Sequence, residues 1–364
     1  MDQIPPAKPE MDREMIEAAT SALQNERLVM GESVFKFEEA FAKYVGVKHA
    51  VSLSSGTDAL IIALTAMDCV GKEVVTTPFS FIATANCIIH ALGTPVFHDA
   101  RAIDYNLDTK GLDKAFTKNT RAVMPVHLFG HPCDMNAIND LAEERGAMVI
   151  EDACQAHGAI YNGKKAGALG HVGCFSFYPT KNMTVGGDGG MVTTDDEDLS
   201  KKVAKYRDCG RVTRYLHDVV GFTSRLNNCN AAIGLVQLKR LDQWNDNRRK
   251  IAKRYDQKLK DIAGITLPPK AGKGKDPVYH LYVIRADRRD DLAKQMTEAG
   301  IVTAVHYPVP IHLQPAYVER YGYKNGSFRV SEGLSQQVLS LPMFPSMSNE
   351  QVDRVCETVV KFYR

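Results

Sequence analysis

The sequence predicts an α/β protein: a large domain with a mixed, mostly parallel sheet flanked by helices, and a smaller α+β domain at the C-terminal end. Over roughly the first two thirds of the 364 residues, short runs that are apolar on both faces alternate with helical segments. This alternation is typical of buried parallel strands. Beyond about residue 231 a long charged helix and mixed elements follow. We therefore expect domains at 1–240 and 241–364, with the N-terminal segment packing on the smaller one.

The individual elements follow from the same patterns. β-branched and apolar runs predict strands at 49–55, 73–78, 94–100, 121–129, 148–153, 174–179 and 190–194. Helical spacing predicts helices at 57–68 and 136–145, and one long helix through 235–264. In that helix the basic cluster Arg248, Arg249 and Lys250 is expected on a solvated face, because acidic residues interleave with it. A Pro/Gly/Lys loop at 267–277 precedes a strand at 278–287 and helices at 291–300 and 349–363.

Composition excludes several classes of protein. The 45 basic and 43 acidic residues give a net charge of +2, which does not fit nucleic-acid binding. No apolar run is long enough to span a membrane, and the first residues carry Pro and acids where a secretory signal has an apolar core, so we expect a cytoplasmic protein. The eight cysteines are scattered without a C-x-x-C pair, which favours reduced, mostly buried thiols over a metal site.

Two side chains that follow apolar strands suggest chemistry. Asp152 ends the strand 148–153, and Lys181 follows the strand 174–179 and precedes a glycine-rich stretch. Ligands of α/β proteins bind where the carboxyl ends of the strands meet. A lysine that is desolvated there has a lowered pKa, and its neutral amine can attack a carbonyl. Taken alone, Lys181 fits a surface lysine in a turn better than a nucleophile, and only its surroundings reverse this preference.

The surrounding residues match the parts that pyridoxal phosphate requires. An acid beside the pyridine nitrogen keeps it protonated, and Asp152 is suitably placed. The cofactor's phosphate needs N–H groups at a helix start and hydroxyl donors, which Gly56, Thr57 and Ser176 can supply. Phe81 follows another strand and can stack on the ring. Competing motifs are weaker: the glycines of 167–173 do not open a helix after an early strand, and the histidines near residues 127–157 lack metal-ligand spacing.

A set of motifs resembles a known family. SSGTDAL, TPFSFIATAN, PVHLFGHPCDM, EDACQAHGA, SFYPTKN with GDGG, and HYPVPIHLQPAY occur in this order and cover essentially the whole chain. They resemble the DegT/StrS family of sugar aminotransferases, which have the aspartate-aminotransferase type of fold. The resemblance implies that Lys181 bonds covalently to pyridoxal phosphate and moves a proton. It also implies cofactor contacts from Gly56, Thr57, Phe81, Asp152, Gln155 and Ser176, with Gln155 on the 3-hydroxyl.

The resemblance also implies a homodimer with shared active sites. The family commonly has Asn in a G-x-N-x-R segment that reaches the phosphate of the neighbouring subunit. Here Thr223 takes the Asn position, and a hydroxyl reaches less far than an amide. Arg225, or Asn227 or Asn228 nearby, is then expected to compensate.

The reaction implied is transfer of an amino group from L-glutamate to a nucleotide-linked keto sugar, with a 3-keto sugar slightly favoured over a 4-keto sugar. His306 and His312 are candidates for substrate contacts, although packing or capping roles are equally open. Some relatives replace the lysine with His and act as dehydratases, so the presence of Lys181 favours transamination over a lyase. A non-enzymatic regulator of the same fold is a third possibility, which Lys181 also disfavours.

Overall fold

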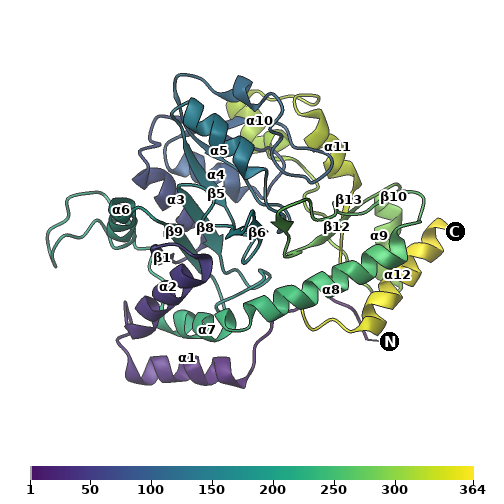
Figure 1. Ribbon diagram of the computed structural model, residues 1–364, viewed down its shortest axis with the longest axis horizontal. Helices are drawn as coiled ribbons and strands as arrows, with labels where there is room; N and C mark the ends of the chain where they lie inside the picture. The colour runs from purple at the N-terminus through teal and green to yellow at the C-terminus, as the bar shows by residue number, and fades with distance from the viewer. Residues whose placement is uncertain (1) are drawn as a thin grey trace.

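A large mixed sheet forms the centre of the computed structural model, which describes residues 2–364 (Figure 1). Within these residues it has seven strands in the order β1-β9-β8-β5-β4-β2-β3, and only β9 runs antiparallel to its neighbours. The strands are β1 (His49–Leu53), β2 (Glu73–Thr76), β3 (Thr94–Phe97), β4 (Thr120–Met124), β5 (Met148–Asp152), β8 (Val172–Ser176) and β9 (Gly190–Thr194). The predicted α/β class with a mostly parallel sheet is confirmed.

Helices cover both faces of this sheet, because successive side chains of a strand point to opposite faces. On β8, Val172 and Cys174 join one apolar core, whereas Phe175 joins another on the far side. The first core is covered by α3 (Gly56–Ala66), α4 (Ala83–His90) and α6 (Glu197–Arg207). The opposite face is covered by α2 (Glu32–Val45) and α5 (Met135–Glu144). Burial on both faces explains why these strands are apolar throughout.

The parallel strands bring four chain segments to one edge. β1, β2, β5 and β8 all point the same way, so the residues that follow them gather at the carboxyl edge of the sheet. These are the turns that begin α3 and α4, the end of β5 and the turn after β8. The edge is therefore where a ligand site is expected.

The C-terminal elements build a second core. A three-stranded antiparallel sheet packs against helices and encloses residues such as Tyr255, Tyr282 and Val355. Its elements are α8 (Leu241–Leu259), β10 (Ile265–Thr266), β12 (Tyr282–Ala286), α9 (Arg289–Glu298), β13 (Val338–Leu341) and α12 (Asn349–Tyr363). Helix α7 (Asn228–Leu238) precedes them and packs against α2 instead. Further short elements are β6 (Ile160–Tyr161), β7 (Lys164–Lys165) and β11 (Lys275–Asp276), which pair together, and the helices α10 (Pro315–Tyr321) and α11 (Arg329–Gln337).

Two expectations for this region are wrong. The predicted long helix is divided into α7 and α8 at residues 239–240, where Arg240 leaves the helix and pairs with Asp12 and Glu14. Arg248 is buried rather than solvated, because its guanidinium donates to the main-chain carbonyls of Tyr279, His280 and Met343. Three carbonyl acceptors can hold a buried cation that a sequence pattern places on the surface.

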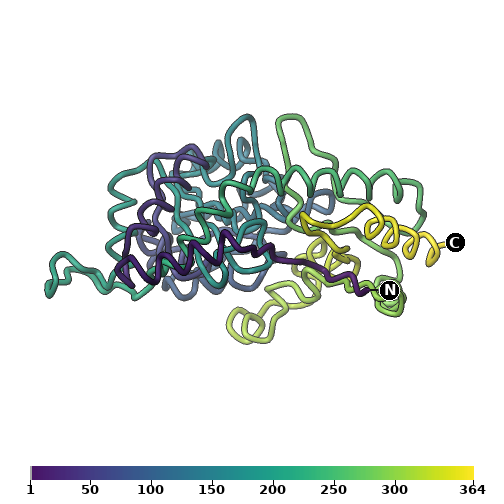
Figure 2. The backbone as a smooth tube through the Cα atoms, turned by 90° about the horizontal axis from the view of Figure 1, so that it is seen from below, coloured from purple at the N-terminus to yellow at the C-terminus, as the bar shows by residue number. Residues whose placement is uncertain are grey.

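The N-terminal segment runs alongside both cores before helix α1 (Arg13–Asn25) (Figure 2). Ile4 is buried in the C-terminal core and exchanges main-chain hydrogen bonds with Gly300 and Val302. Farther along, the carbonyl of Glu10 accepts from Gln237 of α7 at 2.8 Å. The N-terminal segment thus contacts the C-terminal core at Ile4 and helix α7 at Glu10.

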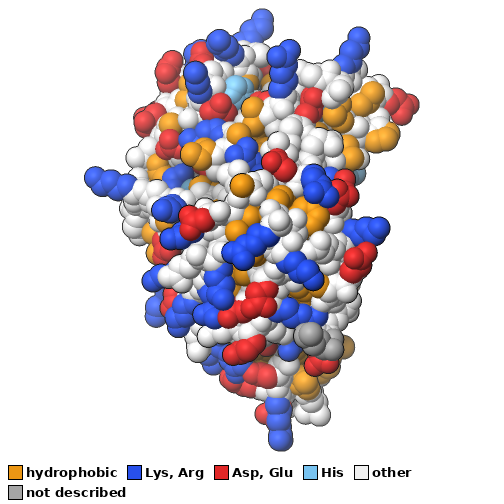
Figure 3. All heavy atoms as spheres, turned by 90° about the vertical axis from the view of Figure 1, so that its right-hand side faces the viewer, with side chains coloured by type: hydrophobic (Ala, Val, Ile, Leu, Met, Phe, Trp, Pro, Cys, Tyr) orange, Lys and Arg blue, Asp and Glu red, His pale blue; other side chains and the backbone are white. Residues whose placement is uncertain are grey.

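The segment between α6 and α7 projects from the body of the molecule, at the left of Figures 1 and 2. We call residues 209–224 the arm. Its exposed side chains include Tyr215, Leu216 and Val220, which are 57–95% accessible. On the opposite end of the molecule, the side bearing α12 has acidic and basic side chains interspersed (Figure 3). None of the helices formed by residues 2–364 combines the length and the apolar character needed to cross a membrane.

Candidate active site

A cavity of about 560 Å³ opens at the carboxyl edge of the large sheet. It brings together eight of the residues predicted from the sequence: Gly56, Thr57, Phe81, Asp152, Gln155, Ser176, Lys181 and His306. It is also lined by residues that the sequence analysis did not identify, among them Ser80, Thr84, Cys154, His280 and Tyr307. The predicted convergence of strand ends therefore produces one site.

The turn between β1 and α3 forms one wall. Ser55 is the N-cap of α3, and its hydroxyl accepts from the main-chain N–H of Asp58 at 3.0 Å. Gly56 lies so close to β8 that a Cβ atom there would come within 2.4 Å of the Cβ of Ser176. Any larger residue would push the helix start away from Ser176. The hydroxyls of Thr57 and Ser176 thus lie beside the N-terminus of a helix, where an anion is stabilised.

Asp152 ends β5 and is buried at the cavity wall. Its Oδ2 accepts from the hydroxyl of Thr84 at 2.8 Å, and its Oδ1 accepts from the main-chain N–H of Cys154 at 3.3 Å. Because the single proton of Thr84 goes to the carboxylate, the hydroxyl of Ser80, 2.9 Å from Thr84, is the donor in that pair. These donors hold the carboxylate in one orientation toward the cavity.

Lys181 lies in the turn after β8, where its main-chain N–H donates to the main-chain carbonyl of Tyr178 at 2.9 Å. Its side chain lines the cavity. Burial lowers the pKa of its amine below the ordinary value, and the negative charge of Asp152 opposes this shift only in part. A lysine with a lowered pKa is neutral in a larger fraction of molecules and is a better nucleophile. The surface-lysine interpretation of Lys181 is therefore not supported.

Gln155 and Phe81 shape the remaining walls. The amide Nε2 of Gln155 donates to the hydroxyl of Tyr307 at 3.0 Å, whereas its Oε1 is buried and finds no hydrogen-bond partner anywhere in the described residues. Buried polar atoms are rarely left unpaired, so this atom indicates a ligand that is polar at that position. The ring of Phe81 lies 6.2 Å from the ring of Tyr307 and is 55% exposed, so one face is available for stacking.

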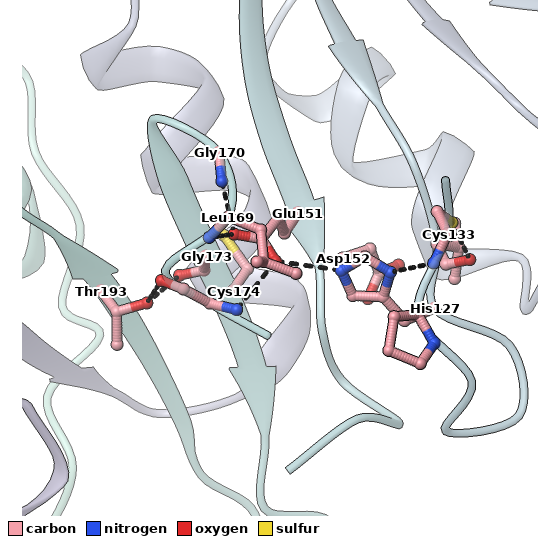
Figure 4. A network of polar contacts seen from close by, with 12 residues as sticks. His127, Cys133, Glu151, Asp152, Leu169, Gly170, Gly173, Cys174 and Thr193 are labelled. Atoms are coloured by element: carbon pink, nitrogen blue, oxygen red, sulfur yellow. Dashed lines mark hydrogen bonds and ion pairs between the residues drawn. The ribbon is translucent and has the colours of Figure 1, made fainter. Parts of the chain in front are cut away.

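A buried polar network supports β5 from behind (Figure 4). Glu151 adjoins Asp152 in the strand and therefore points to the opposite face. Its carboxylate accepts from His127 Nε2 at 3.0 Å and from the N–H groups of Gly167, Leu169 and Gly170 at 2.7–2.8 Å. His127 Nδ1 in turn accepts from the N–H of Cys133 at 3.1 Å, which fixes the proton on Nε2. The network anchors the strand that carries Asp152.

The other predicted residues have different surroundings. His306 lines the cavity, and its Nδ1 lies 2.8 Å from the hydroxyl of Ser340. His312 is fully buried among aromatic rings, pairs with Glu332 at 3.0 Å and does not line the cavity, so its surroundings fit the packing role, and its substrate contact stays a prediction. Thr223 and Arg225 lie at the base of the arm and outside the cavity of their own chain. Thr223 contacts Cys209, and Arg225 pairs with Asp208.

The mostly parallel sheet, with a lysine and a carboxylate at its carboxyl edge, matches the fold class of the pyridoxal-phosphate-dependent aminotransferases. The chain belongs to the DegT/DnrJ/EryC1/StrS aminotransferase family, whose model matches residues 9–360. It is 40% identical over 351 residues to a dTDP-3-amino-3,4,6-trideoxy-alpha-D-glucose transaminase of Streptomyces venezuelae, covering 96% of this chain and 92% of the relative.

A second relative and a solved structure are similar over the full length of the chain. A pleiotropic regulatory protein of Geobacillus stearothermophilus is 42% identical over 365 residues, which cover all of this chain and 97% of that protein. The crystal structure of S. venezuelae DesV in complex with a ketimine intermediate superimposes with a TM-score of 0.97 at 38% identity, covering 100% of this chain and 99% of that one. The chain is an aminotransferase of this family with the fold predicted from its sequence.

Proposed function

We propose that this protein transfers the amino group of L-glutamate to carbon 3 of a nucleotide-linked keto sugar, with pyridoxal phosphate as its cofactor. The observation that carries the proposal is the single cavity in which Lys181, Asp152 and Gln155 meet at the start of helix α3. Support for carbon 3 comes from the 40% identical transaminase, which is named for a 3-amino sugar.

The residues of the cavity fit the cofactor. The unpartnered Oε1 of Gln155 marks a place for a polar ring substituent. The N-terminus of α3, with Thr57 and Ser176, suits a phosphate, and the close approach at Gly56 keeps these groups together. A buried carboxylate at Asp152 suits a protonated ring nitrogen, and the exposed face of Phe81 suits the ring.

When bound, pyridoxal phosphate supplies an electron sink that stabilises negative charge at the substrate carbon. Asp152 keeps that sink effective, because its negative charge favours the proton on the ring nitrogen. Lys181 anchors the cofactor through its Nζ and, when released, carries a proton to or from the substrate carbon. Burial serves this task, since a lowered lysine pKa lets the amine accept a proton near neutral pH.

We further propose that the active enzyme is a homodimer with shared sites. Among the described residues that line the cavity, Lys181 is the single cation, while Asp152 and Asp188 are acidic. A cofactor phosphate, a nucleotide diphosphate and the carboxylates of glutamate need more positive charge than this. The arm carries exposed apolar side chains suited to an interface, and Arg225 at its base is the cation we expect a second copy to contribute.

We also propose a division into two domains and a cytoplasmic location. The division into domains 1–240 and 241–364 is supported by the separate core around β12 and α8, into which Ile4 also packs. A cytoplasmic location is supported by eight free cysteines, five of them buried, which suit a reducing compartment.

The reaction is tested with purified protein that has been loaded with pyridoxal phosphate. Glutamate should release one 2-oxoglutarate per bound cofactor, and reverse reactions with a panel of nucleotide-linked amino sugars should identify the acceptor. Borohydride should attach the cofactor to the peptide containing Lys181, and Lys181→Ala should abolish this attachment. Deoxygenated sugar without amine would indicate a lyase. Failure to bind the cofactor would indicate a regulatory protein.

Sharing of sites is tested by mixing two inactive variants, Lys181→Ala and Arg225→Ala. If Arg225 serves the partner's site, each mixed dimer contains one intact site, and random mixing restores about a quarter of the wild-type activity. If Arg225 serves its own chain, the mixture stays inactive and the proposed sharing is wrong.

A further inference from the structure

His280 lines the cavity beside Lys181 and has no part in the mechanism described so far. It is connected to the catalytic turn through Asn182, the residue directly after Lys181. Both side chains are buried, with 5% and 3% exposure. His280 Nδ1 lies 3.2 Å from Asn182 Oδ1. The protonation of His280 therefore depends on which atom Asn182 presents to it.

The orientation of the Asn182 amide is fixed by its other contacts. Its Nδ2 donates to Asn245 Oδ1 at 2.9 Å and to the carbonyl of Val278 at 3.0 Å. Asn245 is itself oriented, since its Nδ2 donates to the carbonyl of His157 at 2.8 Å. Reversing the Asn182 amide would set its oxygen against two acceptors. Asn182 Oδ1 must therefore face His280, and His280 Nδ1 must hold the proton.

A proton on Nδ1 leaves Nε2 unprotonated when the ring is neutral, and the burial of His280, whose exposure is 5%, favours the neutral ring over the imidazolium. Burial lowers the pKa of His280 well below its ordinary value, and the positive charges of Lys181 and Arg248 lower it further. His306 and His157 are the other titratable groups that act on it. Since Nδ1 is turned to Asn182, Nε2 is the ring atom left for a ligand in the cavity. It can accept a hydrogen bond and cannot donate one.

We propose that His280 is a further substrate-binding residue, whose Nε2 accepts a hydrogen bond from a hydroxyl group of the sugar. This inference rests on the proposed sugar aminotransferase function. The two substrates differ in the groups they offer apart from the reacting carbon and amine: a sugar hydroxyl has a proton to donate, whereas the ionised carboxylates of glutamate have none. An acceptor fixed in this way favours the sugar hydroxyl and gives the carboxylates of glutamate no hydrogen bond. Because Asn182 directly follows Lys181, the turn that carries the lysine also fixes the tautomer of His280 and with it this preference.

Two substitutions separate the two nitrogens of His280. His280→Asn keeps a donor near the Nδ1 position, so the contact with Asn182 can persist, but it removes the acceptor at Nε2. His280→Gln keeps an acceptor near the Nε2 position. His90→Asn, on an exposed histidine of α4 outside the cavity, serves as the matched control.

The half-reactions are measured separately in single turnovers. For His280→Asn, kcat/KM with the keto sugar should fall roughly 5- to 100-fold, the loss expected when a substrate hydroxyl loses its buried partner. The glutamate half-reaction should stay within about twofold of wild type. His280→Gln should recover most of the loss, and His90→Asn should behave as wild type. Equal losses in both half-reactions, or no loss with the sugar, would overturn the proposal.

The tautomer is tested without turnover. In protein carrying nitrogen-15 histidine, the ring signals lost in His280→Asn should be those of a neutral imidazole protonated on Nδ1. Asn182→Ala should change this signal by removing the acceptor of the Nδ1 proton. A ring that is doubly protonated or protonated on Nε2 would overturn the inference. If wild-type protein transfers no amino group from glutamate, the proposed function fails instead, whatever the tautomer.

Discussion

Replacing Glu151 by Gln is a sharp test of how the strand bearing Asp152 is held. The carboxylate accepts four hydrogen bonds, two on each oxygen: Leu169 and Gly170 on Oε1, and Gly167 and His127 on Oε2. An amide keeps one of these oxygens and replaces the other with a donor. Two buried donors then lose their acceptor, at a cost of about 1–3 kcal/mol each. We expect the free energy of unfolding to fall by about 2–6 kcal/mol.

Urea unfolding followed by far-ultraviolet circular dichroism measures this change, as a lower midpoint at an unchanged slope. The matched control is Glu144→Gln on α5, because that side chain is 70% exposed and only loosely paired with Arg145. The control should change stability by less than about 0.5 kcal/mol. A loss below about 1 kcal/mol for Glu151→Gln would mean that the network relaxes around the amide, and our account of β5 would be refuted.

Three further outcomes follow from the site. Asp152→Asn should still bind pyridoxal phosphate but lose turnover by orders of magnitude, and near-normal turnover would remove its role in the electron sink. Thr84→Val, which deletes one hydrogen bond to the Asp152 carboxylate, should lower kcat by roughly 10- to 100-fold; a loss as large as that of Asp152→Asn would contradict a positioning role. Burial lowers the pKa of His306 from 6.5 to about 4. Between these pH values His306 binds more protons in the unfolded chain than in the folded one, so the free energy of unfolding should fall as the pH drops from 6.5 to 4. His306→Asn should flatten that fall in urea titrations at different pH, and an unchanged slope would show that His306 does not titrate in this way.

Much of the fold and site followed from strand ends. Asp152 and Ser176 end parallel neighbouring strands, and Gly56 follows a third strand with the same direction, so their convergence is a geometric consequence of a parallel sheet. Apolar runs located these strands to within a few residues. Both the apolar character of a strand and the polar residue at its end can be recognised within a few consecutive residues, which is why the sequence pattern was sufficient.

Other features depend on long-range partners and could not be predicted in this way. Arg248 is buried because three carbonyls from later segments surround it, and His312 is buried because Glu332 and aromatic rings enclose it. Two missed cavity residues did leave a signal. Thr84 lies three residues after Phe81, in the first turn of α4, and His280 interrupts an apolar strand-like run.

The position of Ile4 has a consequence for biosynthesis. This side chain belongs to a core that is completed only when residues near 301 and 355 exist, almost a full chain length later. During synthesis, the side chain of Ile4 therefore lacks its native packing partners until the C-terminal core residues have been made. Closure of the C-terminal core should be among the last events of folding.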